Sequence, residues 1–287
     1  MKKIIDKIKD FSELVVFQHS VFALPFIFIA MVVAAKGWFG FKLLILGVFA
    51  AVTARNFAMG FNRFMDRDID KLNPRTANRP NVDGRISAKS MFIFVLINAI
   101  GFVLVAYFIN NLALILSIPI LIVLGSYSYF KRFSYLAHII LGVSLALAPI
   151  AGVVAVSESI PLWVVMLSIG VMFWVAGFDL LYSLQDIDID KKLGLHSIPS
   201  VFGVEKTMLF SKIFHFLTVV FWLIFVVLSS SSYFAYLAVI ISAVMLSYEH
   251  YLVNKDFKKI DRAFFTVNGY LGFVFLILII LDNTFLI

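Results

Sequence analysis

The sequence has no cysteine and little charge. Only 14% of its 287 residues are Asp, Glu, Lys or Arg, whereas 62% are hydrophobic. Without cysteine there can be no disulfide and no thiolate-bound metal, so the composition says nothing about redox compartment. The five histidines include no close pair at zinc-ligand spacing, which makes a zinc site unexpected. A chain this apolar is not an ordinary soluble domain, and we expect it to lie in a lipid bilayer.

The chain does contain a series of long apolar runs. A bilayer-spanning helix needs about 20 largely apolar residues, and nine such runs fill most of residues 1–287, which we interpret as one domain. A mixed-charge amphipathic segment, Met1 to Asp10, precedes the first run, and no small-residue cleavage site follows it, so we interpret that run as a retained helix. The predicted spans are 14–35, 41–61, 91–109, 112–130, 135–156, 161–183, 209–229, 232–252 and 264–282.

The basic residues are distributed on one side of these predicted spans. A net charge of +7 could suggest a nucleic-acid partner, but most Lys and Arg residues precede the first span or follow even-numbered spans. The opposite connections carry only Lys36 and Lys42. The positive-inside rule therefore predicts a multi-pass protein of the cell's inner (cytoplasmic) membrane, with the N-terminus cytoplasmic and the C-terminus outside. We expect no nucleic-acid partner.

Two predicted cytoplasmic connections, about 62–90 and 184–207, are long and polar, and each begins with acidic residues four positions apart. In helical geometry Asn62, Asp66 and Asp70 fall within an arc of roughly 80°. Arg55 lies on the same face two turns deeper, whereas Asp68 points away. Loops of this kind at a membrane face commonly carry function.

The second acidic segment repeats the arrangement of the first. Asp179, Ser183, Asp186 and Asp190 share a narrow helical face, with Tyr182 at its border, and Asp188 lies on the opposite side. An ionised side chain within a span costs roughly 2.5–3.5 kcal/mol on insertion scales. Arg55 and Asp179 are therefore expected to face a polar cavity or a partner, and not lipid.

Carboxylates gathered on one face repel one another unless a cation neutralises them, and ligands that are all oxygen favour Mg2+ or Ca2+. Mg2+ commonly takes one or two carboxylates together with substrate phosphates. The alternative is that each cluster is a solvated helix end beside a basic loop. Two clusters on one membrane side, with Arg55 and Asp179 beneath them, disfavour that alternative. The predicted metal-binding residues are Asn62, Asp66, Asp70, Asp186 and Asp190.

Arginines are concentrated in the loop that follows the first acidic cluster. The guanidinium forks of Arg75, Arg79 and Arg85 suit phosphate oxygens, although positive-inside topology alone explains most such charges. We assign a binding role to Arg79 and leave Arg75 and Arg85 undecided. Lys131 and Arg132, at the end of the fourth span, have the same two interpretations.

The segments Asn62-Arg-Phe-Met-Asp66-Arg-Asp-Ile-Asp70, Arg75-Thr-Ala-Asn-Arg79-Pro and Asp179-Leu-Leu-Tyr182-Ser-Leu-Gln-Asp186-Ile-Asp-Ile-Asp190 resemble the UbiA superfamily of intramembrane prenyltransferases. The Lys131-Arg132 pair and the nine spans belong to the same likeness. The resemblance implies nine helices around a central cavity capped by cytoplasmic loops, with Mg2+ bridging both aspartate motifs to an isoprenyl diphosphate. It implies catalytic roles for Asp66, Asp70, Asp179, Asp186 and Asp190, and diphosphate contacts for Arg79, Lys131 and Arg132.

Within that superfamily the segments His19 to Pro25, Arg55 to Asn62 and Gly194 to Pro199 look most like the bacterial quinone-pathway branch labelled 4-hydroxybenzoate polyprenyltransferase. Some members of the branch are thought to prenylate a dihydroxynaphthoate. The implied activity is Mg2+-dependent transfer of a polyprenyl group to an aromatic acid, of the 4-hydroxybenzoate or 1,4-dihydroxy-6-naphthoate type, in ubiquinone or menaquinone biosynthesis. The acceptor, the prenyl chain length and the oligomeric state are left open.

For such a reaction we expect Mg2+ and basic side chains to neutralise the diphosphate as the allylic C–O bond ionises. The ring of Tyr182 could stabilise the allylic cation, and Asp179 or Asp186 could accept the proton of the acceptor ring. His19 and His138 either hydrogen-bond the acceptor or have a structural partner. We expect structural roles for His215 and His250.

The main rival from another functional class is a membrane transporter for an organic phosphate or a cation. Such a protein would move solute across the bilayer without forming a lipid product. The placement of the charges on one side argues against it, because a translocation path needs polar groups in the outer half of the membrane as well.

Overall fold

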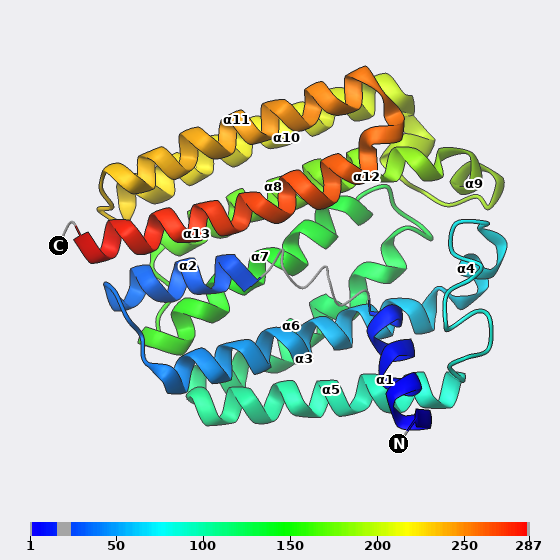
Figure 1. Cartoon of the computed structure of the whole chain (residues 1–287), viewed down its shortest axis with the longest axis horizontal. Helices are drawn as coiled ribbons and strands as arrows, with labels where there is room; N and C mark the ends of the chain where they lie inside the picture. The colour runs from blue at the N-terminus through cyan, green and yellow to red at the C-terminus, as the bar shows by residue number, and fades with distance from the viewer. Residues whose placement is uncertain (1, 16–23, 286–287) are drawn as a thin grey trace.

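The computed structural model describes residues 2–15 and 24–285, which are helical and contain no strand. Eight helices in these ranges are long and apolar enough to cross a bilayer, so the prediction of an all-α polytopic membrane fold is confirmed. They lie side by side with similar axis directions (Figure 1). These spans are built on α3 (Phe41–Met65), α5 (Ala88–Ile109), α6 (Asn111–Phe130), α7 (Ala137–Ser157), α8 (Leu162–Ser183), α10 (Ile198–Leu228), α11 (Tyr233–Lys255) and α13 (Asn268–Phe285).

The first predicted span, 14–35, lies partly outside the described residues. Its described part is α2 (Leu24–Ala35), whose 12 residues are too few to cross a bilayer alone. The amphipathic segment before it forms a separate helix, α1 (Lys2–Leu14), which lies across the ends of its neighbours (Figure 1). The described ranges therefore show eight candidate spans where the sequence predicts nine.

Glycines allow close contact between the helices at the centre of the bundle. A Cβ on Gly142 of α7 would lie 2.4 Å from the carbonyl oxygen of Met172 on α8, and a Cβ on Gly177 of α8 would lie 2.3 Å from the His215 ring on α10. Small residues permit such approaches between membrane helices. Helix α8 is thereby held between α7 and α10, and its buried Trp174 packs against Phe26 and Trp222 in the main apolar core.

The outer faces of the bundle are apolar. Large exposed side chains include Phe49, Leu96, Ile122, Phe216 and Tyr233, each on a different spanning helix. Several polar side chains lie inside instead, which is the distribution expected where lipid surrounds the protein.

Both acidic motifs lie where a spanning helix breaks, at the same end of the bundle (Figure 1). Helix α3 ends before Asp66 and α4 (Arg67–Leu72) follows; α8 is followed by a 3-10 turn (Leu184–Asp186) and α9 (Ile187–Lys192). The expectation of unbroken helical geometry through each motif is wrong, because both central aspartates leave the helical region, Asp66 at φ −94°, ψ 13° and Asp186 at φ −107°, ψ 4°. The backbone bonds from Asp66 N to Asn62 O and from Asp70 N to Asp66 O nevertheless preserve the four-residue spacing of the first motif.

Candidate active site

A cavity of about 410 Å³ opens at this end of the bundle. Its walls come from α3, the loop after α4, the end of α6, α8, α9 and a π-helical turn (Ala263–Val267) that precedes α13. Nine of the side chains predicted to form the site line this one space, although they come from segments more than 100 residues apart in the chain. They are Asn62, Asp66, Asp70, Arg79, Lys131, Asp179, Tyr182, Asp186 and Asp190.

Asp66 is the most buried of the predicted metal ligands, with 2% of its surface exposed. Its Oδ2 accepts a hydrogen bond from Asn62 Nδ2 at 2.9 Å and lies 2.5 Å from Lys131 Nζ. Burial raises the pKa of Asp66 above its ordinary value, and the nearby Lys131 ammonium opposes that shift. The other oxygen, Oδ1, is buried without a hydrogen-bond partner among the described residues.

Asp68 points out of the cavity, as its position predicts, and is 65% exposed. Its carboxylate nevertheless positions Arg132, because it accepts two hydrogen bonds from the Arg132 guanidinium, at 2.9 and 3.1 Å. These hydrogen bonds lower the pKa of Asp68. The same guanidinium donates to the Met65 carbonyl at 2.8 Å and lies 3.6 Å from Asp66. Arg132 is therefore placed beside the site without lining the cavity.

Asp70 anchors the loop that follows the first motif. Arg79 Nη1 donates to its Oδ1 at 2.7 Å, and Asn81 Nδ2 donates to its Oδ2 at 3.2 Å. Asn81 also donates to the Arg63 carbonyl at 3.1 Å, so it connects the loop to α3. Burial lowers the pKa of Arg79 to about 10, which leaves it a cation at neutral pH. The structure thus places Arg79 in the cavity, as predicted.

Arg75 connects the two aspartate motifs. Its guanidinium binds both carboxylate oxygens of Asp186, donates to Tyr182 Oη at 2.9 Å and lies 5.3 Å from the centre of the Tyr182 ring. Asn73 Nδ2 also donates to Asp186, at 3.2 Å. Of the two arginines that the sequence leaves undecided, Arg75 therefore belongs to the site.

Arg85 has different partners. Its guanidinium binds Glu13 at 2.6 and 2.9 Å, Asp10 at 3.2 Å and Asp83 at 2.7 Å. It also donates to the Asn78 carbonyl at 3.0 Å. Arg85 does not line the cavity; it ties helix α1 to the loop.

The remaining two acidic residues of the cavity, Asp179 and Asp190, each contact one polar side chain. Asp190 accepts a hydrogen bond from Ser197 Oγ at 2.7 Å, and Asp179 Oδ2 lies 2.7 Å from Nδ1 of the buried His138. His138 therefore has the structural partner that was one of its two predicted roles. Neither His215 nor His250 lines the cavity; they contact each other inside the bundle, Nδ1 to Nε2 at 3.0 Å.

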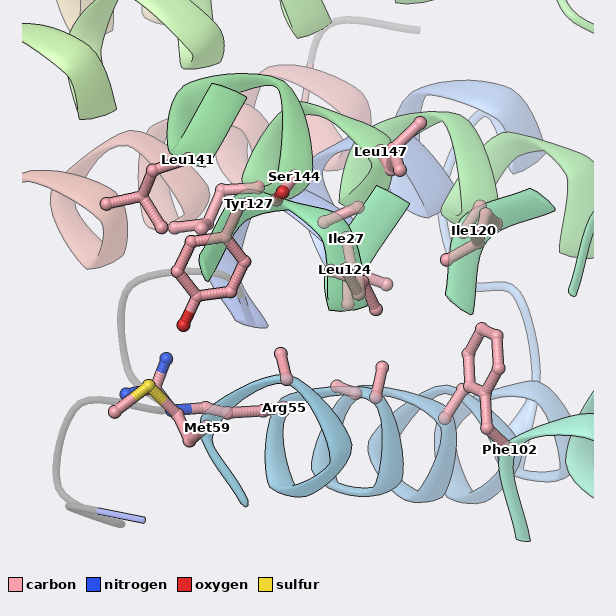
Figure 2. Close-up of a pocket in the computed structure, with 17 residues that line it drawn as sticks. Ile27, Arg55, Met59, Phe102, Ile120, Leu124, Tyr127, Leu141, Ser144 and Leu147 are labelled. Atoms are coloured by element: carbon pink, nitrogen blue, oxygen red, sulfur yellow. The ribbon is translucent and has the colours of Figure 1, made fainter. Parts of the chain in front are cut away.

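Arg55 lies outside this cavity, although helical geometry places it on the same face of the helix as Asn62 and Asp66. It lines a neighbouring apolar cavity of about 120 Å³, and Met59 lines both spaces. Figure 2 shows Arg55, Met59 and the Tyr127 ring at one end of that cavity and Phe102 toward the other. His19 lies outside the described residues.

Sequence reasoning missed five residues of the site. Arg63 is 8% exposed, lines the cavity and donates to Asn62 Oδ1 at 3.0 Å. In the sequence, the charge of Arg63 is explained by the positive-inside rule, and the two loop asparagines are explained as polar residues exposed to solvent. A serine at a helix start and a phenylalanine within an apolar run carried no signal. The missed residues are Arg63, Asn73, Asn81, Ser197 and Phe264.

No three His, Asp or Glu side chains in the described ranges are close enough together to form a closed metal cage. Each of the four motif aspartates in the cavity instead faces a cation or a hydroxyl. Asp66 Oδ1 is buried and accepts no hydrogen bond among the described residues, with only the Arg132 guanidinium 3.6 Å away. This oxygen and the all-oxygen donor set would fit Mg2+ bound together with substrate phosphates. The metal ligands stay a prediction.

A bundle of membrane-spanning helices with acidic and basic side chains around a cavity at one end is typical of a membrane protein that binds a charged ligand. The comparisons with known proteins identify the class. The profile of the UbiA prenyltransferase family matches residues 23–278, and the chain belongs to this family. It is a membrane prenyltransferase, which confirms the resemblance seen in its aspartate motifs.

Individual relatives agree with the family match. The chain is 28% identical over 244 residues to a 4-hydroxybenzoate octaprenyltransferase of Actinobacillus pleuropneumoniae serotype 5b (strain L20), covering 85% of this chain and 83% of that relative. Among solved structures, an apo UbiA homolog from Aeropyrum pernix K1 is 29% identical and has a TM-score of 0.84, with 92% and 98% coverage. A UbiA homolog from Archaeoglobus fulgidus bound to DMAPP and Mg2+ shares the fold at 18% identity, with a TM-score of 0.77 and 96% and 99% coverage.

Proposed function

We propose that the protein transfers a polyprenyl group from an isoprenyl diphosphate to an aromatic acid, with Mg2+ at the two aspartate motifs. The observation that carries the proposal is the composition of the cavity, where both motifs meet the basic side chains of Arg63, Arg75, Arg79 and Lys131. This mixture suits a metal diphosphate, because carboxylates can hold the metal while Arg and Lys bind phosphate oxygens. The relatives named 4-hydroxybenzoate octaprenyltransferase support the aromatic acceptor.

The donor diphosphate would bind at the acidic cavity. When bound, Mg2+ would neutralise part of the charge that develops on the departing diphosphate. Asn62, Asp66 and Asp70 from one motif, with Asp186 and Asp190 from the other, would hold it. The guanidiniums of Arg75 and Arg79 and the ammonium of Lys131 would exchange their present carboxylate partners for phosphate oxygens.

The prenyl chain would extend into the apolar interior. Met59 connects the acidic cavity to the apolar cavity of about 120 Å³. A further apolar cavity of about 50 Å³ shares Ile27, Ala50 and Phe102 with it and continues toward Ile109 and Val154. These spaces favour a hydrocarbon chain because their walls offer few polar partners. The rest of a long chain would leave between helices into lipid.

Arg55 would recognise the carboxylate of the acceptor. It forms no ion pair with any described residue, and its Nε is buried without a hydrogen-bond partner. A guanidinium in an apolar wall is costly unless an anion satisfies it. Tyr127 lies near it, at the same end of the cavity as Met59, which also lines the acidic cavity (Figure 2). An aromatic acid supplies both the carboxylate and an apolar ring for this position.

The proton of the acceptor ring would pass to Asp179. In the reaction the C–O bond of the donor breaks with its electron pair leaving on the diphosphate, and a ring carbon of the acceptor forms the new C–C bond. That carbon then loses its proton, whose bonding electrons restore the aromatic ring. Asp186 would be a ligand of Mg2+ and therefore a poor base, whereas Asp179 lines the cavity and its Oδ2 lies beside the His138 imidazole.

A transporter is less consistent with this interior. The polar cavity lies at one end of the bundle, whereas the two cavities deeper between the helices are apolar. An organic phosphate crossing them would lose its hydration with few compensating polar groups.

Mass spectrometry of reactions with purified protein tests the proposal. Polyprenyl diphosphates of several lengths are offered with a panel of hydroxybenzoates and dihydroxynaphthoates. We expect a prenylated aromatic acid that forms only with Mg2+, disappears with EDTA and returns when Mg2+ is restored. Solute flux in proteoliposomes without any such product would instead support the transporter.

Alanine variants test the metal assignment in the same assay. Asp66→Ala and Asp190→Ala should each reduce transfer by about a hundredfold or more, since each removes a ligand of the Mg2+ whose positive charge stabilises the departing diphosphate. Asp188→Ala is the matched control, because Asp188 is exposed on α9 and does not line the cavity. Full activity in Asp66→Ala would contradict the assignment.

A further inference from the structure

A buried hydrogen-bond network lies in the membrane interior beneath the acidic cavity. Trp174 Nε1 donates to Asn268 Oδ1 at 2.8 Å, and Asn268 Nδ2 donates to Glu249 Oε1 at 2.8 Å. All three side chains are buried, and Glu249 is only 1% exposed. None of them lines the acidic cavity, so the proposed transfer does not use them directly. An ionisable residue buried inside a membrane protein is costly, and such residues commonly have a functional or structural role.

The network holds an irregular turn of the backbone. Residues Ala263–Val267 form a π-helical turn, in which one extra residue is accommodated before α13 begins at Asn268. Asn268 Nδ2 also contacts the carbonyl of Ala263, at 3.4 Å. The Asn268 amide therefore uses its oxygen on Trp174 and its two N–H groups on Glu249 and on the turn itself.

That turn places an aromatic ring in the wall of the cavity. Phe264 lines the acidic cavity and packs on Tyr182, with ring centres 4.3 Å apart and planes inclined by 32°. Phe178 lies edge-on to Phe264 at 5.1 Å and continues the contact to Trp174 at 5.1 Å. Trp174, Phe178 and Tyr182 follow one another four residues apart on α8, so one helix face supports the whole wall.

Tyr182 alone does not explain how this wall would stabilise positive charge. Its hydroxyl accepts from Arg75 and that guanidinium lies near its ring, so a cation already occupies part of its surroundings. A second ring in the same wall adds negative π density beside the carbon from which the diphosphate departs.

We propose that Phe264 contacts the reacting end of the prenyl donor and that Asn268, held by Glu249 and Trp174, is the positioning residue that presents it. This inference rests on the proposed prenyl transfer. As the C–O bond breaks and its electron pair leaves with the diphosphate, the Phe264 ring faces the positive charge on the allylic carbon. The acceptor ring then supplies the electron pair of the new C–C bond and passes its proton to Asp179.

Fluorination of Phe264 tests the electrostatic role without a large change of shape. Successive replacement of Phe264 by mono-, di- and trifluorophenylalanine withdraws electron density from the ring face. We expect kcat to fall stepwise, by about tenfold over the series, while KM for the donor changes little. The same series at Phe273, which is 41% exposed on α13 and does not line the cavity, should leave kcat unchanged. A flat kcat across the Phe264 series would overturn the proposal.

The positioning role has its own readout. Asn268→Ala should lower kcat and also abolish the sensitivity to fluorine at position 264, because the ring no longer faces the reacting carbon. Glu249→Gln should retain both properties, since an amide oxygen can still accept from Asn268. Glu249→Leu gives a second test if Asn268→Ala does not fold. Persistence of full fluorine sensitivity in either disruptive variant would overturn the positioning role. If the unmodified enzyme forms no prenylated product at all, the proposed function fails instead.

Discussion

At the scale of single residues, the aspartates of the site form ion pairs with basic residues that are distant in the sequence. Arg75 binds Asp186, and Lys131 binds Asp66, so cations from one segment neutralise aspartates of another. These pairs keep the carboxylates from repelling one another, and each cation is already in place for a phosphate group. The exposed Asp68, expected to be a bystander, takes part by holding Arg132.

The contrast between two arginines of one loop leads to a prediction. Arg75→Leu should lower kcat/KM for the donor by about a hundredfold, because it removes a bidentate cation from the diphosphate site. Arg75→Lys should restore little, since an ammonium lacks the fork geometry. Steady-state kinetics at saturating acceptor provide the measurement.

Arg85→Leu is the matched control for that substitution. Its guanidinium binds Glu13, Asp10 and Asp83 and does not line the cavity. A change of less than about threefold is expected, in line with the small energies of exposed ion pairs. Equal losses in the Arg75 and Arg85 variants would show that both act through the fold of the loop.

At the scale of helices, the breaks at Asp66 and Asp186 are what build the site. Helix α3 ends just before Asp66 and α4 follows, whereas α8 ends at Ser183 and a 3-10 turn that ends at Asp186 precedes α9. A straight continuation of α3 would carry Asp70 away from the bundle. The break instead leaves Asp70 buried, where it meets Arg79 and Asn81.

The apolar cavities between α3, α5, α6 and α7 lead to a prediction about chain length. Ala50 on α3 lines both of them, whereas Arg55 lines only the larger one, so Ala50→Phe should fill the space that the two share. Transfer from long polyprenyl diphosphates should fall at least about tenfold, while transfer from a five-carbon donor should change little. Product distributions from mixed donors, read by mass spectrometry, measure the effect.

Val48→Phe is the control on the same helix. Val48 is exposed on the outside of the bundle and lines neither apolar cavity, so its enlargement should leave chain-length preference unchanged. If Ala50→Phe accepted all donor lengths equally well, the prenyl chain would have to follow another route.

At the scale of the whole molecule, the two ends of the bundle differ in charge. Helices α1, α4 and α9 lie at the end with the acidic cavity, and α13 ends at the opposite end (Figure 1). Lys36 and Lys42, the only basic residues of the predicted outer connections, flank the turn between α2 and α3. This asymmetry supports an orientation with the cavity facing the cytoplasm.

Because the chain has no cysteine, single introduced thiols test this orientation without background. Ser87 directly precedes α5, in the connection that follows α4, and Ser159 lies in the connection between α7 and α8; both positions are exposed and would be replaced by cysteine. A membrane-impermeant maleimide should label position 159 in intact cells and position 87 only in inverted vesicles. The reverse pattern would place the cavity outside the cell.

The sequence by itself determined the membrane class, the eight spans that the described residues show and nine of the side chains that line the cavity. These follow from local properties: hydropathy over about 20 residues and acidic spacing along a helix. It also determined the family, because the aspartate motifs are contiguous in the chain. The first predicted span, 14–35, stays a prediction, because part of it lies outside the described residues.

Only the tertiary structure decided between Arg75 and Arg85, moved Arg55 into the apolar cavity and revealed Arg63, Asn81 and Phe264. The physical reason is that each of these depends on contacts between segments distant in the chain. A guanidinium that binds Asp186 and one that binds Glu13 look alike in one loop, and a phenylalanine in an apolar run shows no sign of a π-helical turn. Partners across the bundle, and not neighbours in the sequence, give these side chains their roles.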